Sequence, residues 1–176
     1  MTREQLEHVL RASAAIANET SFVVIGSQAV LLSFPNAPEA LLVSRELDLY
    51  PALHPEKADL IDGAIGPLSS FHETFGYHAD GVGPETAVMP NDWMDRATFH
   101  YIGNITAICP EIHDLAVSKC AASREKDADF VRVLLREHMI EAATLEQRIR
   151  QLDPSRCPVD TISAWAARRA AEAAAP

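Results

Sequence analysis

The spacing of apolar residues predicts alternating helices and strands in the first half of the chain. Apolar side chains recur every three to four residues over 2–18, which indicates an amphipathic helix. The short run Ser21–Ile25 has the β-branched, apolar composition of a strand and ends at Gly26-Ser27. The same criteria then predict, in chain order, a helix over 28–34, a strand over 42–50 and helices over 55–66 and 69–75.

The pattern changes after Gly76 and changes again after Pro110. Gly, Pro and Asn interrupt short segments between these two residues, and we interpret the segments as antiparallel strands over 86–89, 97–102 and 105–109. Gly103-Asn104 has the composition of a two-residue hairpin turn. After Pro110 the helical period returns and predicts helices over 112–122, 127–138, 144–152 and 161–174.

This order of elements predicts an α+β fold, in which a small mixed β-sheet has flanking helices and the last third of the chain is helical. We expect residues 1–110 to form the α/β core and residues 111–176 to form a helical part packed on the same domain. A length of 176 residues suits one domain of ordinary size.

Composition and charge restrict the classes of function. The chain has no apolar run near the ~20 residues that span a bilayer, and its N-terminus lacks an apolar signal core, so we expect a cytoplasmic protein without a membrane partner. A net charge of -10 argues against a broad, sequence-blind nucleic-acid surface. Because 10 of the 15 Lys and Arg residues lie in 119–176, an RNA acceptor stays compatible with the sequence.

Gly26 and Ser27 lie between a predicted strand and a predicted helix. Glycine lets a phosphate approach the main chain closely, the start of a helix offers free N–H groups, and serine adds a hydroxyl donor. The pattern therefore indicates a phosphate-binding turn. The alternative is an ordinary turn in which serine caps the helix.

Glu46 and Asp48 alternate with Leu47 and Leu49 in the second predicted strand. A period of two places both carboxylates on one face of the strand, while the leucines face the core. Two adjacent carboxylates repel each other unless a cation lies between them, and Mg²⁺ binds one or two carboxylates together with substrate phosphate oxygens. The alternative is a solvated sheet face that carries two acids.

A Gly-Ser turn followed about 20 residues later by an acid-x-acid strand resembles the signature of the nucleotidyltransferase fold, the polymerase β-like superfamily. Residues 109–129 contain Asp114-Leu-Ala, Lys119, Arg124 and Asp127, and resemble a helix pair of the AbiEii-like toxins and of related uncharacterised nucleotidyltransferases. The segments 44–51, 75–77 and 81–86 are also similar to that uncharacterised family, so the resemblance covers Phe22 to Leu135.

The resemblance implies a nucleotidyltransferase-like fold and a set of site residues. Metal ligands implied by the resemblance are Glu46 and Asp48, and the nucleotide-binding residues are Gly26, Ser27, Lys119 and Arg124. Asp48, Glu46 and Asp127 would be catalytic, with Asp127 near the active site as a base for the incoming hydroxyl. The alternative for the helix residues is that Lys119 and Arg124 pair with Glu125 or Asp114 on a solvated helix face.

The function that the resemblance implies is the Mg²⁺-dependent transfer of an NMP from an NTP to an RNA (such as tRNA) or protein acceptor. A toxin paired with an antitoxin protein is the biological setting that the resemblance suggests. Two alternatives use the same fold: a non-catalytic nucleotide- or partner-binding module, and a metal-dependent phosphohydrolase. Superfamily members usually carry a third carboxylate on a later strand, and its candidates here, Glu73, Asp80 and Asp95, lie in no clear apolar strand. The sequence therefore leaves a one-ion site or a degenerate site open.

Overall fold

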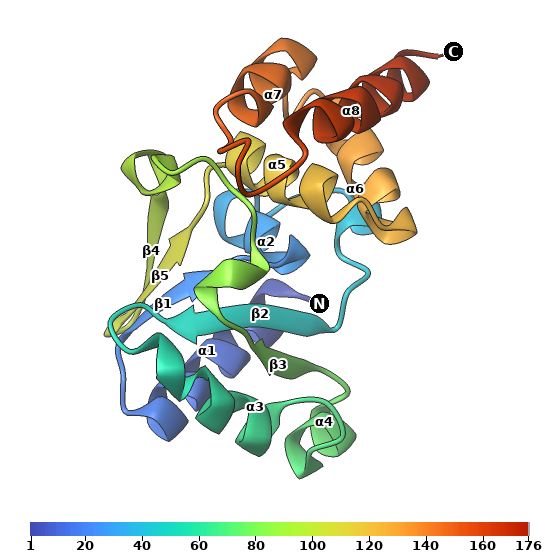
Figure 1. Ribbon diagram of the computed structural model, residues 1–176. Helices are drawn as coiled ribbons and strands as arrows, with labels where there is room; N and C mark the ends of the chain where they lie inside the picture. Colours follow the sequence, from blue (N-terminus) through green and yellow to red (C-terminus); the bar gives the residue numbers. More distant parts are fainter. Residues whose placement is uncertain (176) are drawn as a thin grey trace. The chain divides into compact units, whose positions relative to one another are not determined.

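The computed structural model describes residues 1–175, which form two compact units. One unit, here called the sheet unit, contains Met1–Thr86 and Thr98–Cys109. The other, the helical unit, contains Ala87–Ala97 and the chain from Pro110 onward. Helices and a mixed sheet occur together, with helices at the C-terminal end, so the fold belongs to the predicted α+β class (Figure 1).

The sheet unit is built on a five-stranded mixed sheet with the strand order β3-β2-β1-β5-β4. β1 pairs antiparallel with β2 and parallel with β5, while β2 pairs parallel with β3 and β4 pairs antiparallel with β5. The strands are β1 (Ser21–Val24), β2 (Glu46–Pro51), β3 (His78–Gly81), β4 (Thr98–Ile102) and β5 (Ile105–Cys109).

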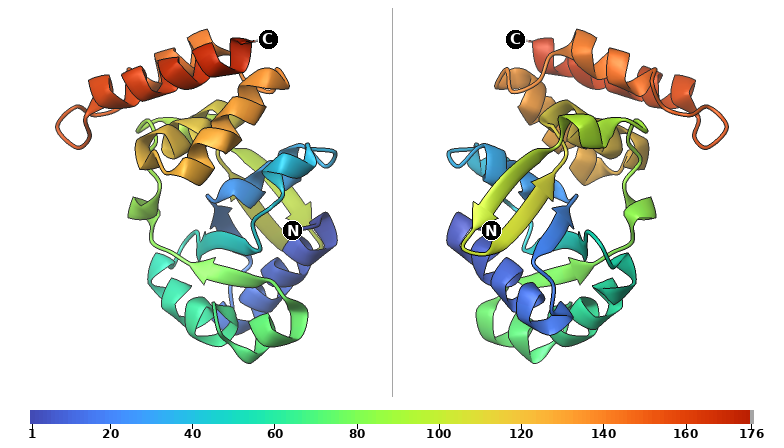
Figure 2. Two further views of the ribbon diagram at one scale, coloured as in Figure 1. Left: turned by 90° about the vertical axis from the view of Figure 1, so that its right-hand side faces the viewer. Right: turned by 90° about the vertical axis from the view of Figure 1, so that its left-hand side faces the viewer.

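One face of this sheet is covered and the other is only partly covered. On the covered face, Leu47, Leu49 and Ala79 are fully buried. Helices α1 and α3 lie against this face (Figures 1 and 2). On the other face the side chains of Glu46 and Asp48 are half-buried. Helix α1 begins at a capping box between Thr2 and Gln5, as predicted. The helices of this unit are α1 (Arg3–Ala17), α2 (Val30–Ser33), α3 (Ala58–Ile65) and α4 (Ser70–Phe75).

Two predictions for the region 76–110 are wrong. Residues 86–89 form no strand, because Pro84 begins a 3-10 turn, the Thr86 amide donates to the Gly83 carbonyl and Pro90 follows. The first strand of the region is β3, which runs parallel to β2 and was not predicted. A parallel pair requires a crossover of a dozen or more residues, and α3 with α4 provides it between β2 and β3.

The predicted hairpin of β4 and β5 is confirmed. Ile102 pairs with Ile105 across the two-residue loop Gly103-Asn104. Gly103 has a φ of 62°, which glycine adopts without the steric cost that a Cβ would add. A glycine at the first loop position is typical of a type II′ turn, whose twist matches that of the flanking strands.

The helical unit has a core of its own. Leu134, Leu145 and Ile149 are buried, and Trp165 is 9% exposed. Predicted and observed helices agree to within three residues at each end. The helices are α5 (Ile112–Ala122), α6 (Glu125–Arg136), α7 (Ala142–Ile149) and α8 (Val159–Ala174), and a 3-10 turn covers Trp93–Arg96. Within residues 1–175, no helix combines the length and the apolar character needed to cross a membrane.

Candidate functional site

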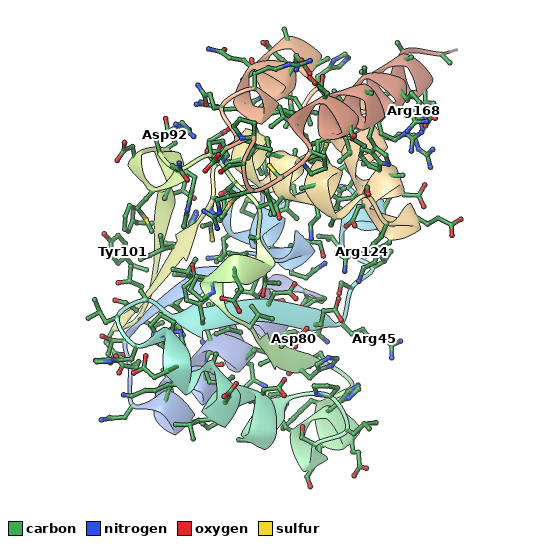
Figure 3. The ribbon with its side chains drawn as sticks, viewed as in Figure 1. Arg45, Asp80, Asp92, Tyr101, Arg124 and Arg168 are labelled. Atoms are coloured by element: carbon green, nitrogen blue, oxygen red, sulfur yellow. The ribbon has the colours of Figure 1, made fainter. Side chains whose placement is uncertain are left out.

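The partly covered face of the sheet brings three carboxylates together. In the parallel pairing of β2 and β3, Asp80 lies directly beside Asp48, and His78 lies beside Glu46. Because side chains alternate between the two faces along each strand, Glu46, Asp48 and Asp80 share one face. Figure 3 labels Asp80 on β3, next to β2. The sheet register therefore joins an acid from a second strand to the predicted acid-x-acid pair.

The surroundings of Asp80 change its affinity for a proton. Burial raises the pKa of Asp80, and the negative charges of Glu46 and Asp62 raise it further. A side-chain hydrogen bond with Asp48 acts in the opposite direction. Carboxylates this close raise each other's pKa, and a cation between them relieves their repulsion. The arrangement is therefore electrostatically suited to positive charge.

Sequence reasoning named Asp80 only as one of three candidates for a third carboxylate. Glu73 lies on α4 and Asp95 lies in the 3-10 turn of the helical unit, so neither is on a strand. The local signal was weak because the strand His78-Ala79-Asp80-Gly81 contains no large apolar residue. Only glycine fits at position 81, because a Cβ there would lie 2.2 Å from the Ala58 carbonyl oxygen. Close packing on α3 thus requires the glycine that obscured the strand.

Gly26 packs directly against the Asp48 carboxylate. The Ile25 amide donates to the Asp48 carbonyl at 3.1 Å, which places the Gly-Ser turn beside β2. A Cβ built on Gly26 would lie 1.6 Å from Asp48 Oδ2 and 2.6 Å from its Cγ. The φ of Gly26 is -78°, which any residue adopts, so glycine is required here for space and not for conformation. The two sequence motifs are therefore in contact.

Ser27 begins a 3-10 turn (Ser27–Ala29) that leads into the four-residue helix α2. This helix is shorter than the predicted span of 28–34, so its dipole contributes less than a longer helix would. The turn is fixed by Gln28, which is fully buried and donates from Nε2 to the Leu41 carbonyl at 3.2 Å. Any phosphate contact at this turn would therefore rely on main-chain N–H groups and the Ser27 hydroxyl.

The acid cluster fits a magnesium ion that the substrate helps to bind. Among residues 1–175 there is no group of three or more His, Cys, Asp or Glu side chains arranged to hold a metal by itself. Mg²⁺ characteristically takes one or two carboxylates and completes its shell with water and substrate phosphate oxygens. Asp48 and Asp80 provide such a pair, and their direct pairing on neighbouring strands is the observation that favours a cation there.

His78 is a site neighbour that sequence reasoning missed. It is 9% exposed, and its ring lies 4.3 Å from the ring of His72 on α4. Burial lowers the pKa of His78, and His72 lowers it further. A neutral histidine therefore lies beside Glu46. A single histidine without a motif gives no signal in the sequence, and only the pairing of β2 with β3 places it at the cluster.

Lys119 belongs to the helical unit and is buried there. It lies on α5 and is 8% exposed, with its ammonium nitrogen 5.9 Å from the centroid of the Phe130 ring on α6. A buried lysine is uncommon, because removing an ammonium group from water is costly. Lys119 therefore does not lie on the solvated helix face that the alternative interpretation assumed.

Arg124 and Asp127 form a local pair at the start of α6. Asp127 is 2% exposed and accepts hydrogen bonds from the Arg124 main-chain N–H at 3.2 Å and from its Nε at 2.7 Å. Acceptors in the first turn of a helix satisfy main-chain donors that lack an intrahelical partner. Asp127 therefore has a structural role in the helical unit, and its proposed role as a base stays a prediction.

This structural role gives a testable expectation for Asp127→Ala. Losing the acceptor at the start of α6 is expected to lower the free energy of unfolding by about 1–2 kcal/mol. Thermal unfolding followed by circular dichroism measures the effect. The matched control is Asp129→Ala, because Asp129 pairs with Arg132 on the exposed side of the same helix and should contribute less than about 0.5 kcal/mol. Equal stabilities of the two variants would contradict the assignment.

Comparison with known families gives one match. Residues 4–165 match the model of a protein family described as "Nucleotidyltransferase of unknown function (DUF6036)". The match covers both units and includes every site residue predicted from the sequence. No curated protein and no solved structure matches the chain.

Proposed function

The chain belongs to this family of nucleotidyltransferases of unknown function, and from that premise we propose that it is a metal-dependent enzyme that moves an NMP from an NTP to an RNA or protein acceptor. The observation that carries the metal-dependent part is the direct pairing of Asp48 with Asp80 on neighbouring strands, with Gly26 packed against Asp48. Two carboxylates beside a glycine turn suit a phosphate chain and its cation.

The sheet residues have separate tasks in this proposal. Asp48 and Asp80 would hold Mg²⁺, which supplies charge neutralisation and in-line alignment of the phosphates. Gly26 leaves room for the Asp48 carboxylate, and the Ser27 turn offers N–H and hydroxyl donors to the phosphates. Glu46, two residues before Asp48 on β2, adds negative charge to the same face. These groups bind and orient the substrate.

The helical unit supplies the remaining proposed residues. Lys119 and Arg124 are proposed phosphate contacts, because ammonium and guanidinium groups both bind phosphate oxygens. Asp127 is the proposed base for the acceptor hydroxyl. The support is the resemblance of residues 109–129 to the helix pair of AbiEii-like toxins, which also supports a toxin role with an antitoxin partner.

The non-catalytic alternative had one argument in its favour, the lack of a third carboxylate in an apolar strand. Asp80 occupies a strand position beside Asp48, so that argument no longer applies. The phosphohydrolase alternative uses the same carboxylates with water as the nucleophile. It differs from transfer in its product, because hydrolysis leaves the nucleotide free and transfer attaches it to an acceptor.

The test of this proposal is incubation of the protein with each NTP labelled at the α-phosphate, Mg²⁺ and cell extract. We expect label on RNA or on protein, and EDTA should abolish it. Asp80→Asn keeps the shape of the side chain and removes its charge, so label transfer should fall by about tenfold or more. The matched control is Glu73→Gln on the exposed part of α4, which should leave transfer unchanged.

Three results would contradict the proposal in different ways. Free labelled NMP without labelled acceptor would indicate hydrolysis. Transfer that persists in EDTA would exclude the metal. Equal label transfer in Asp80→Asn and Glu73→Gln would show that Asp80 has no role in the reaction.

A further inference from the structure

The outer edge of β4 is open. β4 is the last strand of the sheet and pairs only with β5 among the described residues. Figure 2, right, shows β4 and β5 facing the viewer. An open edge presents unpaired main-chain N–H and C=O groups, to which another strand can bind.

Unlike most exposed edges, this one lacks the features that discourage strand pairing. Proteins usually protect such edges with lysine, proline, a bulge or a very short strand. Strand β4, Thr-Phe-His-Tyr-Ile, contains no lysine or proline and is in continuous register with β5 over five residues. The opposite edge, β3, is shorter and contains Asp80 and Gly81.

The hairpin turn determines which groups of β4 point outward. In a two-residue hairpin the flanking pair, here Ile102 and Ile105, is hydrogen-bonded, and bonded and non-bonded pairs then alternate along the strands. Phe99 and Tyr101 fall on non-bonded pairs, so their main-chain N–H and C=O groups point to the open edge. Their side chains share one face and are 51% and 75% exposed. Figure 3 shows Tyr101 extending outward from β4.

We propose that the β4 edge binds a second copy of this chain, with the two β4 strands antiparallel and His100 on the two-fold axis. In this register Phe99 of each copy faces Tyr101 of the other. Both residues direct main-chain groups outward, so each Phe99–Tyr101 pair makes two N–H···O=C bonds. The interface is isologous, as a two-fold dimer requires. Cross-strand aromatic pairs add to the stability of such a ladder.

Charge favours a copy of the chain over a charged partner. The chain carries a net charge of -10, so most of its surface repels a second copy. Residues 97–110 contain no Asp, Glu, Lys or Arg. Burial lowers the pKa of His100, and Arg3 lowers it further, so this residue is neutral at pH 7. Two copies can therefore meet at β4 without charged side chains on the paired strands.

The two-fold axis lies perpendicular to the sheet, since it relates two antiparallel strands in one plane. The dimer therefore has a continuous ten-stranded sheet, and both copies expose their Asp48–Asp80 face on the same side. The dimer does not require catalysis, so this proposal does not rest on the proposed function.

Sedimentation velocity of the full chain over a range of concentrations tests the proposal. A five-residue edge makes a small interface, so we expect a reversible dimer with a Kd on the order of 1–100 µM. Tyr101→Lys places a charge on the edge and should weaken the dimer at least about tenfold. The matched control is Leu53→Lys, which also adds a lysine at an exposed apolar residue. Leu53 is 77% exposed and follows β2, which β1 and β5 separate from β4, so the Kd should not change.

A cross-link tests the register. The facing His100 pair is non-hydrogen-bonded, with Cα atoms about 4.5 Å apart, which is within disulfide range. His100→Cys should form a disulfide dimer on mild oxidation in a Cys157→Ser background, since Cys109 and Cys120 are buried. Leu53→Cys in that background is the control and should stay monomeric. A chain that is monomeric at every concentration, or a dimer unaffected by Tyr101→Lys, would overturn the proposal.

Discussion

Gly26→Ala is expected to reduce nucleotidyl transfer at least about 100-fold, to the level of Asp48→Ala, while the chain stays folded. The added Cβ would lie 1.6 Å from Asp48 Oδ2, and the atoms nearest to it all belong to the Asp48 side chain. A side chain can rotate away at low cost, so the alanine displaces the carboxylate and leaves the main chain in place. A catalytic group displaced by an ångström commonly costs about two orders of magnitude in rate.

The matched control for this prediction is Gly63→Ala. Gly63 lies in α3, and a Cβ there meets no atom within 4 Å. Alanine is favoured over glycine in a helix by up to about 1 kcal/mol, so this variant should be fully active and slightly more stable. Transfer of α-labelled NTP, calorimetric Mg²⁺–NTP affinity and thermal unfolding are the measurements. Wild-type affinity in Gly26→Ala would contradict the contact between the two motifs.

Arg96→Ala is expected to destabilise the helical unit by about 3–5 kcal/mol. Asp114 has no exposed surface, and Arg96 donates to its two oxygens from Nε at 2.8 Å and from Nη2 at 3.1 Å. Removing one partner of a buried ion pair leaves an uncompensated charge in a medium that solvates it poorly. Arg148 lies 3.9 Å from the same carboxylate and compensates only part of the loss.

Tryptophan fluorescence isolates this effect, since both tryptophans of the chain, Trp93 and Trp165, belong to the helical unit. Urea unfolding followed by fluorescence gives the change in free energy. Asp92→Ala is the control, because Asp92 contacts the same arginine but is 51% exposed and should contribute less than about 1 kcal/mol. Replacing the buried pair together, in Arg96→Met with Asp114→Leu, should recover much of the stability. A small loss in Arg96→Ala alone would contradict the ion-pair argument.

Local patterns predicted most of the helices and the hairpin. Helices α5 to α8 follow from the 3.6-residue period after Pro110, and the β4–β5 turn follows from Gly103-Asn104, because both signals depend on neighbouring residues. Strand β3 was missed since its four residues contain no branched apolar side chain, and its place in the sheet depends on β2 and α3. The segment 87–97 likewise joins the helical unit, where Arg96 binds Asp114 across 18 residues of sequence.

For the candidate site, too, some residues could be predicted from the sequence and some contacts could not. The sequence alone predicted Gly26, Ser27, Glu46 and Asp48 as site residues, because a turn and a period-two strand are each formed by consecutive residues. Only the tertiary structure decided that Asp80 lies beside Asp48, that Gly26 touches the Asp48 carboxylate, and that His78 lies beside Glu46. These relations depend on strand register, which is fixed by burying one whole face of the sheet against α1 and α3. A single strand does not contain that information.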